Sequence, residues 1–413
     1  MRISDIHSRH SIGLPNFLMV TAVLLLICIG LAAIYSATTG QQGVVVSKTF
    51  QHQLYWFLLG IVLFLLSFSF PMQFYQAFAY LFYASILLCL IAVLFIGKAG
   101  GGAVRWLSIF GFRFQPSEWT KLAVIFAIAR YIADNPDKIQ RKRHLLVIAG
   151  LGALPMLLIF KQPDLGTSLV FLAIVPSMMY WAGVSPLILF LAVIPALTMI
   201  ASFQLWSFFL VMGILIVILI YKKIKPLFIY LHVGFNIIVG IFTPYFWNSL
   251  HEYQQNRILS FLGLVHDPKG ISYQVIQSKV AIGSGGFGGK GFLAGTQTQL
   301  RFLPEQHTDF IFTVIGEELG FVGSVIVLLL FTWLLIRSLQ IALSVRNRFA
   351  SLVAIGITTM FLYHYFVNLG MVMGIMPVTG LPLPFISYGG SFLNASMVSV
   401  ALLLNFSYRR QEF

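Results

Sequence analysis

The sequence predicts an all-α, polytopic integral membrane protein, folded as a single domain over residues 1–413. Three observations predict this class: 59% of the 413 residues are hydrophobic, only 9% are charged, and the mean hydropathy is +0.90. Soluble domains carry about 25% charged residues, so this chain lacks the polar surface of a soluble protein. The cysteines, Cys28 and Cys89, both lie in apolar runs, which argues against a disulfide framework or a cysteine-based metal site.

Twelve apolar runs are predicted to form spanning helices, because about 20 apolar helical residues cross a hydrocarbon core about 30 Å thick. In chain order they are Phe17–Ser36, Leu54–Phe70, Phe74–Ile96, Ser117–Ile132, Leu145–Phe160, Leu165–Trp181, Pro186–Ala201, Leu205–Tyr221, Pro226–Thr243, Phe310–Ile336, Ala350–Val372 and Ser387–Phe406. The four runs between Leu165 and Thr243 are joined so tightly that the prediction is about 10–12 transmembrane helices. The first run is too long for a signal peptide and is expected to remain as an anchor.

The distribution of Lys and Arg predicts that both termini are cytoplasmic, because basic loops remain on that side of the membrane. With twelve spans, the even-numbered connections and the C-terminal tail carry the basic clusters, which are Lys138, Arg141, Lys142, Arg143, Lys222, Lys223, Lys225, Arg337, Arg346, Arg348, Arg409 and Arg410. The 26 basic and 12 acidic residues give a net charge of +14. We interpret this excess as orientation signals and contacts with anionic lipid headgroups, with no nucleic acid as a partner.

This orientation places the large loop 244–309 outside the cytoplasm. Connections longer than about 15 residues are uncommon and often functional. Within it, Tyr273, Ile276 and Val280 recur at helical spacing, which predicts a short amphipathic helix on the outer leaflet. The glycine-rich run Gly283–Gly291 does not match the spacing of a Walker loop. It is therefore either a flexible turn or a row of backbone N–H groups that contact an anion.

Several ionisable side chains fall at the outer ends of the spans, where burying a charge costs at least about 2.5 kcal/mol and therefore indicates function. The candidates are Arg105, Glu118, Lys121, Asp164, Glu317 and Glu318. Each acid also has a structural interpretation. Glu118 and Lys121 stand three residues apart and can form an internal ion pair, Asp164 can cap a helix, and the adjacent glutamates can hold neighbouring helices.

The segment Leu303–Asp309 contains the sharpest candidate site. A helix is predicted to begin near Thr308 or Asp309, and a carboxylate at that position is stabilised in its ionised form by the helix macrodipole. Asp309, beside His307 and Glu305, therefore has the chemistry to accept a proton from a substrate hydroxyl. The alternative is that Asp309 only caps the helix. Three His residues at metal-ligand spacing are absent from the sequence, so no protein-built metal site is predicted.

Six motifs spread over nearly the whole chain carry a family resemblance. They are Phe114-Gln-Pro-Ser-Glu118 with Lys121, Lys161-Gln-Pro-Asp-Leu-Gly-Thr167, Ile282-Gly-Ser-Gly-Gly286 with Gly289-Lys-Gly291, Phe302-Leu-Pro-Glu-Gln-His-Thr-Asp-Phe310, Gly316-Glu-Glu-Leu-Gly320 and Gly380-Leu-Pro-Leu-Pro-Phe-Ile-Ser-Tyr-Gly-Gly-Ser391. By these motifs, in this order, the chain resembles the SEDS family (shape, elongation, division and sporulation). The segment Gly295–Leu300 is more similar to the elongation branch of that family than to the division branch.

This resemblance implies a peptidoglycan glycosyltransferase that polymerises lipid II into β-1,4 glycan strands during cell elongation, on the outer face of the bacterial cytoplasmic membrane. It also implies a class B penicillin-binding protein transpeptidase and other elongation-complex membrane proteins as partners. The catalytic carboxylate of the family's His-Thr-Asp-Phe motif corresponds to Asp309. The expected substrate-binding residues are Glu118, Lys121, Arg105, Asp164, Glu305, His307, Lys290 and Ser391. A divalent cation, magnesium or manganese, is a further candidate for stabilising the leaving pyrophosphate.

Two departures from the family pattern stand out. Many members have ten spans, whereas this chain adds a hairpin around Leu205–Thr243, which leaves Asp309 on the outer side. Division-branch members carry an acid eight residues before the aspartate, where this chain has Arg301, so a two-carboxylate mechanism through that pair is not expected. A lipid II flippase and a non-catalytic scaffold of the wall-synthesis complex are the alternatives. Transporters often contain internal repeats, and no convincing repeat is found here.

Overall fold

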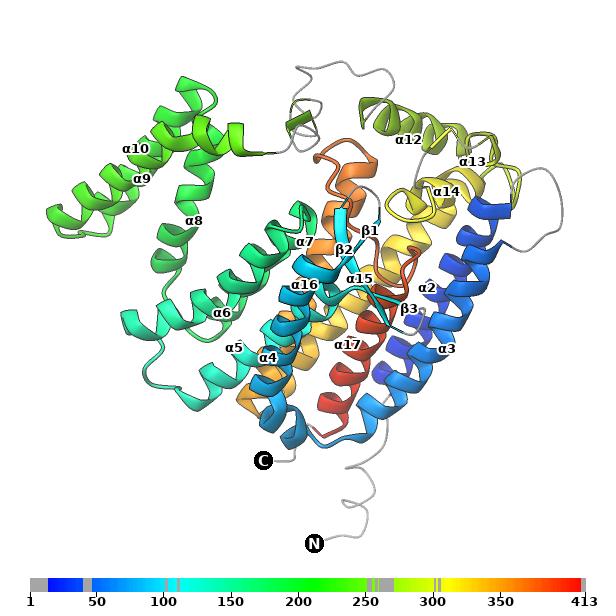
Figure 1. Cartoon of the computed structure of the whole chain (residues 1–413), viewed down its shortest axis with the longest axis horizontal. Helices are drawn as coiled ribbons and strands as arrows, with labels where there is room; N and C mark the ends of the chain where they lie inside the picture. The colour runs from blue at the N-terminus through cyan, green and yellow to red at the C-terminus, as the bar shows by residue number, and fades with distance from the viewer. Residues whose placement is uncertain are drawn as a thin grey trace, which may run out of the picture.

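The computed structural model describes residues 14–39, 47–100, 103–109, 112–250, 255–256, 259, 271–300, 302–303 and 306–409, which form a helical bundle (Figure 1). The long helices are α2 (Leu14–Thr39), α3 (Lys48–Ser69), α4 (Met72–Ile96), α5 (Pro116–Asp134), α6 (Lys142–Phe160), α7 (Leu165–Trp181), α8 (Pro186–Ala201), α9 (Leu205–Tyr221), α10 (Pro226–Ser249), α15 (Gly320–Ser344), α16 (Arg348–Val372) and α17 (Gly390–Tyr408). The shorter helices are α12 (Ile271–Gly285), α13 (Thr296–Gln299) and α14 (Ile311–Glu318).

Each predicted apolar run contains a helix, although the last helix begins at Gly390 rather than at the predicted Ser387, and the all-α polytopic class is confirmed. Eight of the described helices are long and apolar enough to cross a membrane, and α7, α8 and α9 are shorter apolar helices. The central helix α17 is buried over nearly its whole length and packs against α3, α5 and α16. Surface hydrophobic side chains are common, as expected where lipid replaces water: Trp206 is 83% exposed.

The structure corrects the tenth predicted run, Phe310–Ile336, which is two helices. The break lies between Glu318 and Gly320, where Gly320 adopts a left-handed φ of +65° that only glycine tolerates easily. The spanning helix α15 therefore begins at the glycine, and the glutamates belong to the separate short helix α14. At the other end of the large loop, α10 continues through Pro244 to Ser249, so the loop begins later than the sequence indicates.

A three-stranded antiparallel sheet, which was not predicted from the sequence, lies between α4 and α5. Its strands are β1 (Lys98–Gly100), β2 (Ala103–Ile109) and β3 (Phe112–Phe114), in the order β1-β2-β3. The glycines at 100–102 and 111, which flank the β-prone run Val104–Ile109, were the available signal. The sheet matters because β2 carries Arg105.

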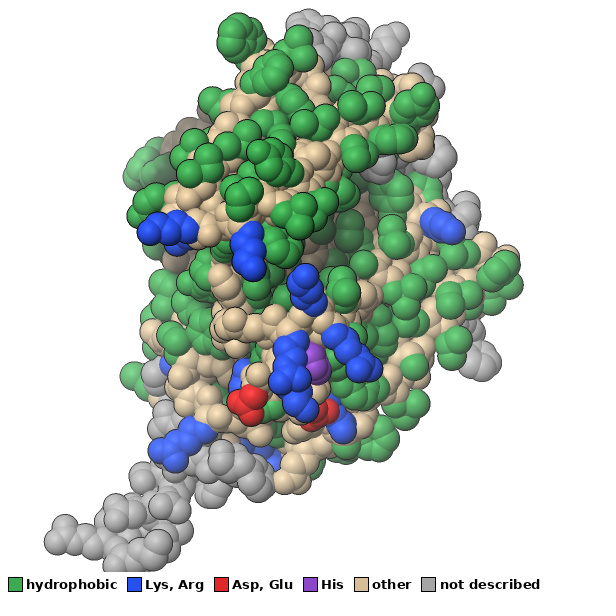
Figure 2. Space-filling model, turned by 90° about the vertical axis from the view of Figure 1, so that its left-hand side faces the viewer, with side chains coloured by type: hydrophobic (Ala, Val, Ile, Leu, Met, Phe, Trp, Pro, Cys, Tyr) green, Lys and Arg blue, Asp and Glu red, His purple; other side chains and the backbone are tan. Residues whose placement is uncertain are grey.

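The basic loops gather at one end of the bundle. Gln140 of the α5–α6 loop donates to the Gly183 carbonyl of the α7–α8 loop, and Arg348 at the start of α16 donates to Ala182. The two ends of the described chain also meet, since the Ser407 hydroxyl donates to Asn16. Figure 2 shows Lys and Arg side chains gathered in the lower part of one face, below a mainly hydrophobic area. An even number of crossings is the arrangement that brings both ends together.

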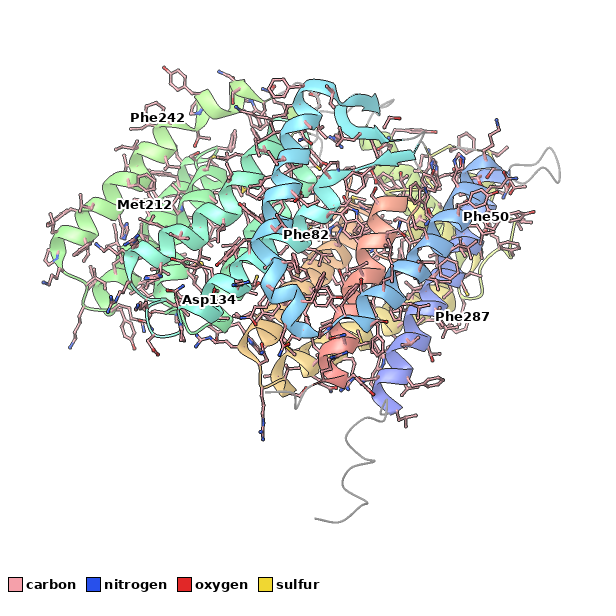
Figure 3. All side chains as sticks on the ribbon, turned by 60° about the horizontal axis from the view of Figure 1, so that its bottom comes forward. Phe50, Phe82, Asp134, Met212, Phe242 and Phe287 are labelled. Atoms are coloured by element: carbon pink, nitrogen blue, oxygen red, sulfur yellow. The ribbon has the colours of Figure 1, made fainter. Side chains whose placement is uncertain are left out.

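Two hydrophobic clusters organise the helices. The main cluster joins the bundle helices, whereas Ile194, Met212, Leu215 and Leu219 form a small second cluster among α8, α9 and α10. In Figure 3, Met212 marks this three-helix group and Phe82 marks the main bundle. The group contacts the bundle through the packing of α8 on α7. It contains the hairpin that the sequence identifies as an addition to the family pattern.

Candidate active site

Asp309 is partly buried in the turn directly before α14. The helix begins at Ile311, and its N-cap residue is Phe310, which makes no side-chain capping bond. The predicted start near Thr308 or Asp309 is therefore two to three residues early. The cap position itself is occupied by Phe310, so Asp309 stands one residue before it. The carboxylate still precedes the N-terminus of α14, where the helix dipole favours a negative charge.

The segment 380–391 connects the Asp309 turn to α5. The Tyr388 N–H donates to the His307 carbonyl at 2.9 Å, and the Ser387 hydroxyl donates to the Thr308 carbonyl at 2.7 Å. The His307 ring packs at a tilt on the Tyr388 ring, with 5.5 Å between centroids. Ser391, a predicted substrate-binding residue, instead accepts a hydrogen bond from the Gln115 N–H at 3.0 Å. This segment thus fixes the turn relative to the first residues of α5.

Glu118 and Lys121 form an enclosed ion pair, so the pairing that the sequence left open is confirmed. The Lys121 ammonium lies 2.6 Å from Glu118 Oε2 and 2.9 Å from His364 Nε2, and 4.8 Å above the Phe392 ring. The His364 Nδ1 atom lies 3.1 Å from the Pro382 carbonyl, which can only accept. The proton therefore sits on Nδ1, and Nε2 accepts from the ammonium. Both side chains of the pair are at most 4% exposed.

One face of α16 links this ion pair to the Asp309 turn. Asn368 lies four residues after His364, which is one helical turn, or about 6 Å along the axis. Its amide nitrogen donates to the Asp309 carbonyl at 2.9 Å and to the Leu381 carbonyl at 2.7 Å. Neither residue is among the candidates predicted from the sequence. The available signal was the presence of two buried polar side chains on one face of the apolar run Ala350–Val372.

Arg105 and Asp164 lie together at the start of α7. Asp164 is the N-cap of α7 and accepts a hydrogen bond from the Thr167 N–H at 3.2 Å, so the capping interpretation is confirmed. Its carboxylate also lies 3.8 Å from the Arg105 guanidinium, which additionally donates to the carbonyls of Gln162 and Pro163. The Arg105 side chain is 28% exposed, whereas Lys121 is 1% exposed. Arg105 is therefore the accessible cation of the two.

Lys290 and the glutamates of α14 form a second polar cluster. Glu317 is fully buried and accepts from the Lys290 ammonium at 2.8 Å, from the N–H groups of Gln297 and Thr298, and from the hydroxyls of Thr296 and Thr298. Burial raises the pKa of Glu317, but these donors outweigh it and hold the pKa below its ordinary value. Glu317 thus holds α13 and the preceding loop against α14, rather than facing an open cavity.

The glycine-rich run is a tight backbone contact with the same helix end. The N–H groups of Lys290 and Gly291 donate to the carbonyls of Glu317 and Glu318, both at 3.0 Å. A Cβ at Gly289 would lie 2.1 Å from the Glu318 carbonyl oxygen. Gly285 and Gly289 are therefore packed on the backbone of α14, whereas nothing lies within 4 Å of the Cβ positions of Gly283, Gly286 and Gly288.

Replacement of Gly289 is expected to destabilise this contact. Its φ of +81° disfavours an L-residue by about 1–2 kcal/mol, and the Cβ clash adds to that cost, so Gly289→Ala lowers the melting temperature in detergent. Gly288→Ala is the matched control, because nothing lies within 4 Å of its Cβ position. Equal melting temperatures for the two variants would contradict the packing role.

Glu305 and Arg301 lie outside the described residues. Among the described residues, no group of three His, Cys, Asp or Glu side chains lies close enough to hold a metal ion. The amphipathic helix expected from Tyr273, Ile276 and Val280 is present as α12, and the last two side chains are exposed.

The comparisons with known proteins cover nearly the whole chain. It is 35% identical over 430 residues to "Peptidoglycan glycosyltransferase RodA" of Treponema pallidum, covering 96% of this chain and 98% of the relative. It is 36% identical over 356 residues to "Peptidoglycan glycosyltransferase MrdB" of Escherichia coli K12, covering 86% and 84%.

Two solved structures share the fold. One, described as "Structural coordination of polymerization and crosslinking by a peptidoglycan synthase complex", superposes with a TM-score of 0.70 at 30% identity, covering 96% of this chain and 98% of the other. The crystal structure of Thermus thermophilus rod shape determining protein RodA superposes with a TM-score of 0.62 at 25% identity, covering 95% and 96%. The family described as cell cycle protein FtsW/RodA/SpoVE matches residues 16–209 and 187–412. The chain therefore belongs to the FtsW/RodA/SpoVE family, which is the family that its motifs resemble.

Proposed function

We propose that this chain is a peptidoglycan glycosyltransferase that polymerises lipid II into β-1,4 glycan strands for cell elongation. The observation that carries the proposal is the Asp309 carboxylate. It lies in the turn before α14, and three neighbouring polar groups hold this turn in place. Figure 1 shows α14 at the end of the bundle away from the two chain termini. The names of the relatives support the same activity.

Asp309 acts as the general base in this proposal. Its carboxylate takes the proton from the 4-hydroxyl of the acceptor sugar while that oxygen attacks the anomeric carbon of the donor. The new carbon–oxygen bond forms as the bond to the pyrophosphate breaks on the opposite face, and the undecaprenyl pyrophosphate leaves with the bonding electrons. The α-linkage of the donor is thereby inverted to a β-1,4 bond.

The departing pyrophosphate requires positive charge in a water-poor site. Because Lys121 is enclosed and Arg105 is accessible, we assign contact with the pyrophosphate to Arg105. In this assignment Lys121, with Glu118, organises the bundle beneath the site. Asp164 then orients the guanidinium, and His307 borders the Asp309 turn.

We propose magnesium or manganese only as an ion that accompanies the leaving pyrophosphate. Among the described residues, no three His, Cys, Asp or Glu side chains come together to hold a metal ion, and Mg²⁺ is commonly held by one or two carboxylates together with substrate phosphates. No step of the proposed reaction is therefore routed through one.

The membrane location and partners follow from the same proposal. We place the chain in the bacterial inner membrane with both termini cytoplasmic, because the basic loops share the end at which Asn16 meets Ser407. A class B penicillin-binding protein transpeptidase is the proposed partner, supported by a solved neighbour that is described as a synthase complex for polymerization and crosslinking. Lipid II and other elongation-complex membrane proteins complete the proposed set.

The proposal is tested by incubating the purified full chain, with its transpeptidase partner, with labelled lipid II in detergent. Detergent removes the two membrane faces, so a flippase gives no product, whereas a polymerase gives long glycan strands that a muramidase digests. If no polymer forms although the folded chain and its partner are both present, the glycosyltransferase proposal is wrong. The flippase and scaffold interpretations would then replace it.

A further inference from the structure

Three consecutive carbonyl groups of the Asp309 turn each accept a hydrogen bond from outside the turn. The donors are the Tyr388 N–H for His307, the Ser387 hydroxyl for Thr308 and the Asn368 amide for Asp309, at 2.9, 2.7 and 2.9 Å. A single such bond fixes one point of a turn. Three in succession fix the path of the backbone, and with it the origin of the Asp309 side chain.

Asn368 is the member of this set that acts on Asp309 itself. It is fully buried in α16, and its Nδ2 atom bridges two carbonyls, those of Asp309 and Leu381. Its Oδ1 atom is buried without a hydrogen-bond partner within the described part of the chain. The two donated bonds therefore hold the amide in the bundle at the cost of one buried acceptor.

We propose that Asn368 is a positioning residue for catalysis, which holds the Asp309 backbone so that the carboxylate meets the acceptor hydroxyl. This inference rests on the proposed function of Asp309 as general base. Asn368 is enclosed within the bundle and bonds to the backbone of Asp309, so it acts through that residue. Misplacement of a catalytic group by about 1 Å can cost about 100-fold in rate, whereas binding of a large lipid-linked saccharide is spread over many contacts. Loss of Asn368 should therefore lower kcat and spare KM.

Asn405 provides a matched control within the same chain. It is also a buried asparagine, in α17, and its Nδ2 atom likewise donates to two carbonyls, those of Phe68 and Phe70, at 2.6 and 2.9 Å. Its Oδ1 atom is also without a partner among the described residues. These bonds lie where α3 meets α4, and Figure 1 shows this connection at the opposite end of the bundle from α14, which follows the Asp309 turn. Asn405→Leu therefore removes the same pair of bonds without touching the site.

The experiment compares wild type, Asn368→Leu and Asn405→Leu as full chains in complex with the transpeptidase partner, using labelled lipid II and melting temperatures in the same detergent. We expect Asn368→Leu to lose about 10–100-fold in kcat with KM changed by less than about threefold. Asn405→Leu should show a similar loss of melting temperature and a kcat near that of wild type. Equal losses of kcat in the two variants, or wild-type kcat in Asn368→Leu, would overturn the proposal.

A second variant covers the case in which Asn368→Leu does not fold. Ser387→Ala removes the donor to Thr308 and the acceptor of the Leu383 N–H, and it leaves Asn368 in place. We expect the same selective loss of kcat. Unchanged kcat in that variant would overturn the positioning role of this set of bonds. Asp309→Asn is measured alongside: if it polymerises at the wild-type rate, the proposed function fails, whereas an inactive Asp309→Asn with a fully active Asn368→Leu overturns the positioning proposal alone.

Discussion

Asp309→Asn is expected to reduce polymerisation of lipid II by about 10²–10⁴-fold, the range typical for removal of a general base. The amide has nearly the same shape as the carboxylate but cannot take the proton of the acceptor hydroxyl. The backbone carbonyl of residue 309 keeps its bond from Asn368, so the turn should keep its path. The measurement is the initial rate of glycan formation by the purified chain with its transpeptidase partner.

Asp134→Asn is the control for this change. It makes the same carboxylate-to-amide replacement at the basic end of the bundle, where Asp134 pairs with Arg130 at 3.2 Å on a partly exposed surface (Figure 3). That variant should polymerise at the wild-type rate. Near-normal activity of Asp309→Asn, with its partner bound and its melting temperature unchanged, would remove Asp309 from the mechanism.

Lys121→Met is expected to destabilise the bundle by about 3–5 kcal/mol, because it leaves the buried Glu118 carboxylate without its cation. The His364 Nε2 atom loses its donor in the same step. The change is measured as a drop in melting temperature in detergent. Asp134→Asn breaks a partly exposed pair and should cost no more than about 1 kcal/mol.

The double variant Glu118→Gln with Lys121→Met separates charge from packing. Removing both charges relieves the unpaired carboxylate, so the melting temperature should recover toward wild type, although the bond to His364 is still lost. If the double variant is no more stable than Lys121→Met, the cost lies in packing or in the His364 contact, and the ion pair is not the source of the stability.

Asp309 stays a prediction, made from its position in the loop and from the family motif. The membrane class and most of the helical runs, in contrast, could be predicted from the sequence alone and are confirmed. These depend on local quantities: a run of about 20 apolar residues spans the bilayer regardless of its neighbours, and basic loops mark one face of the membrane. The pairing of Glu118 with Lys121 could also be predicted from local sequence, because residues three apart on a helix share one face.

The tertiary structure decided the contacts that hold the site. The Asn368 amide meets the Asp309 carbonyl 59 residues away, and the Lys121 ammonium meets His364 across 243 residues. The local sequence around these residues does not predict either contact, because both contacts depend on how α16 packs against α5 and the 380–391 segment. Likewise, the sequence pattern places Gly320 inside one continuous apolar run. The structure shows that its left-handed φ separates α14 from α15. Hydropathy is a property of each segment taken alone, whereas a hydrogen bond needs two groups in register, and only the packed bundle supplies the second group.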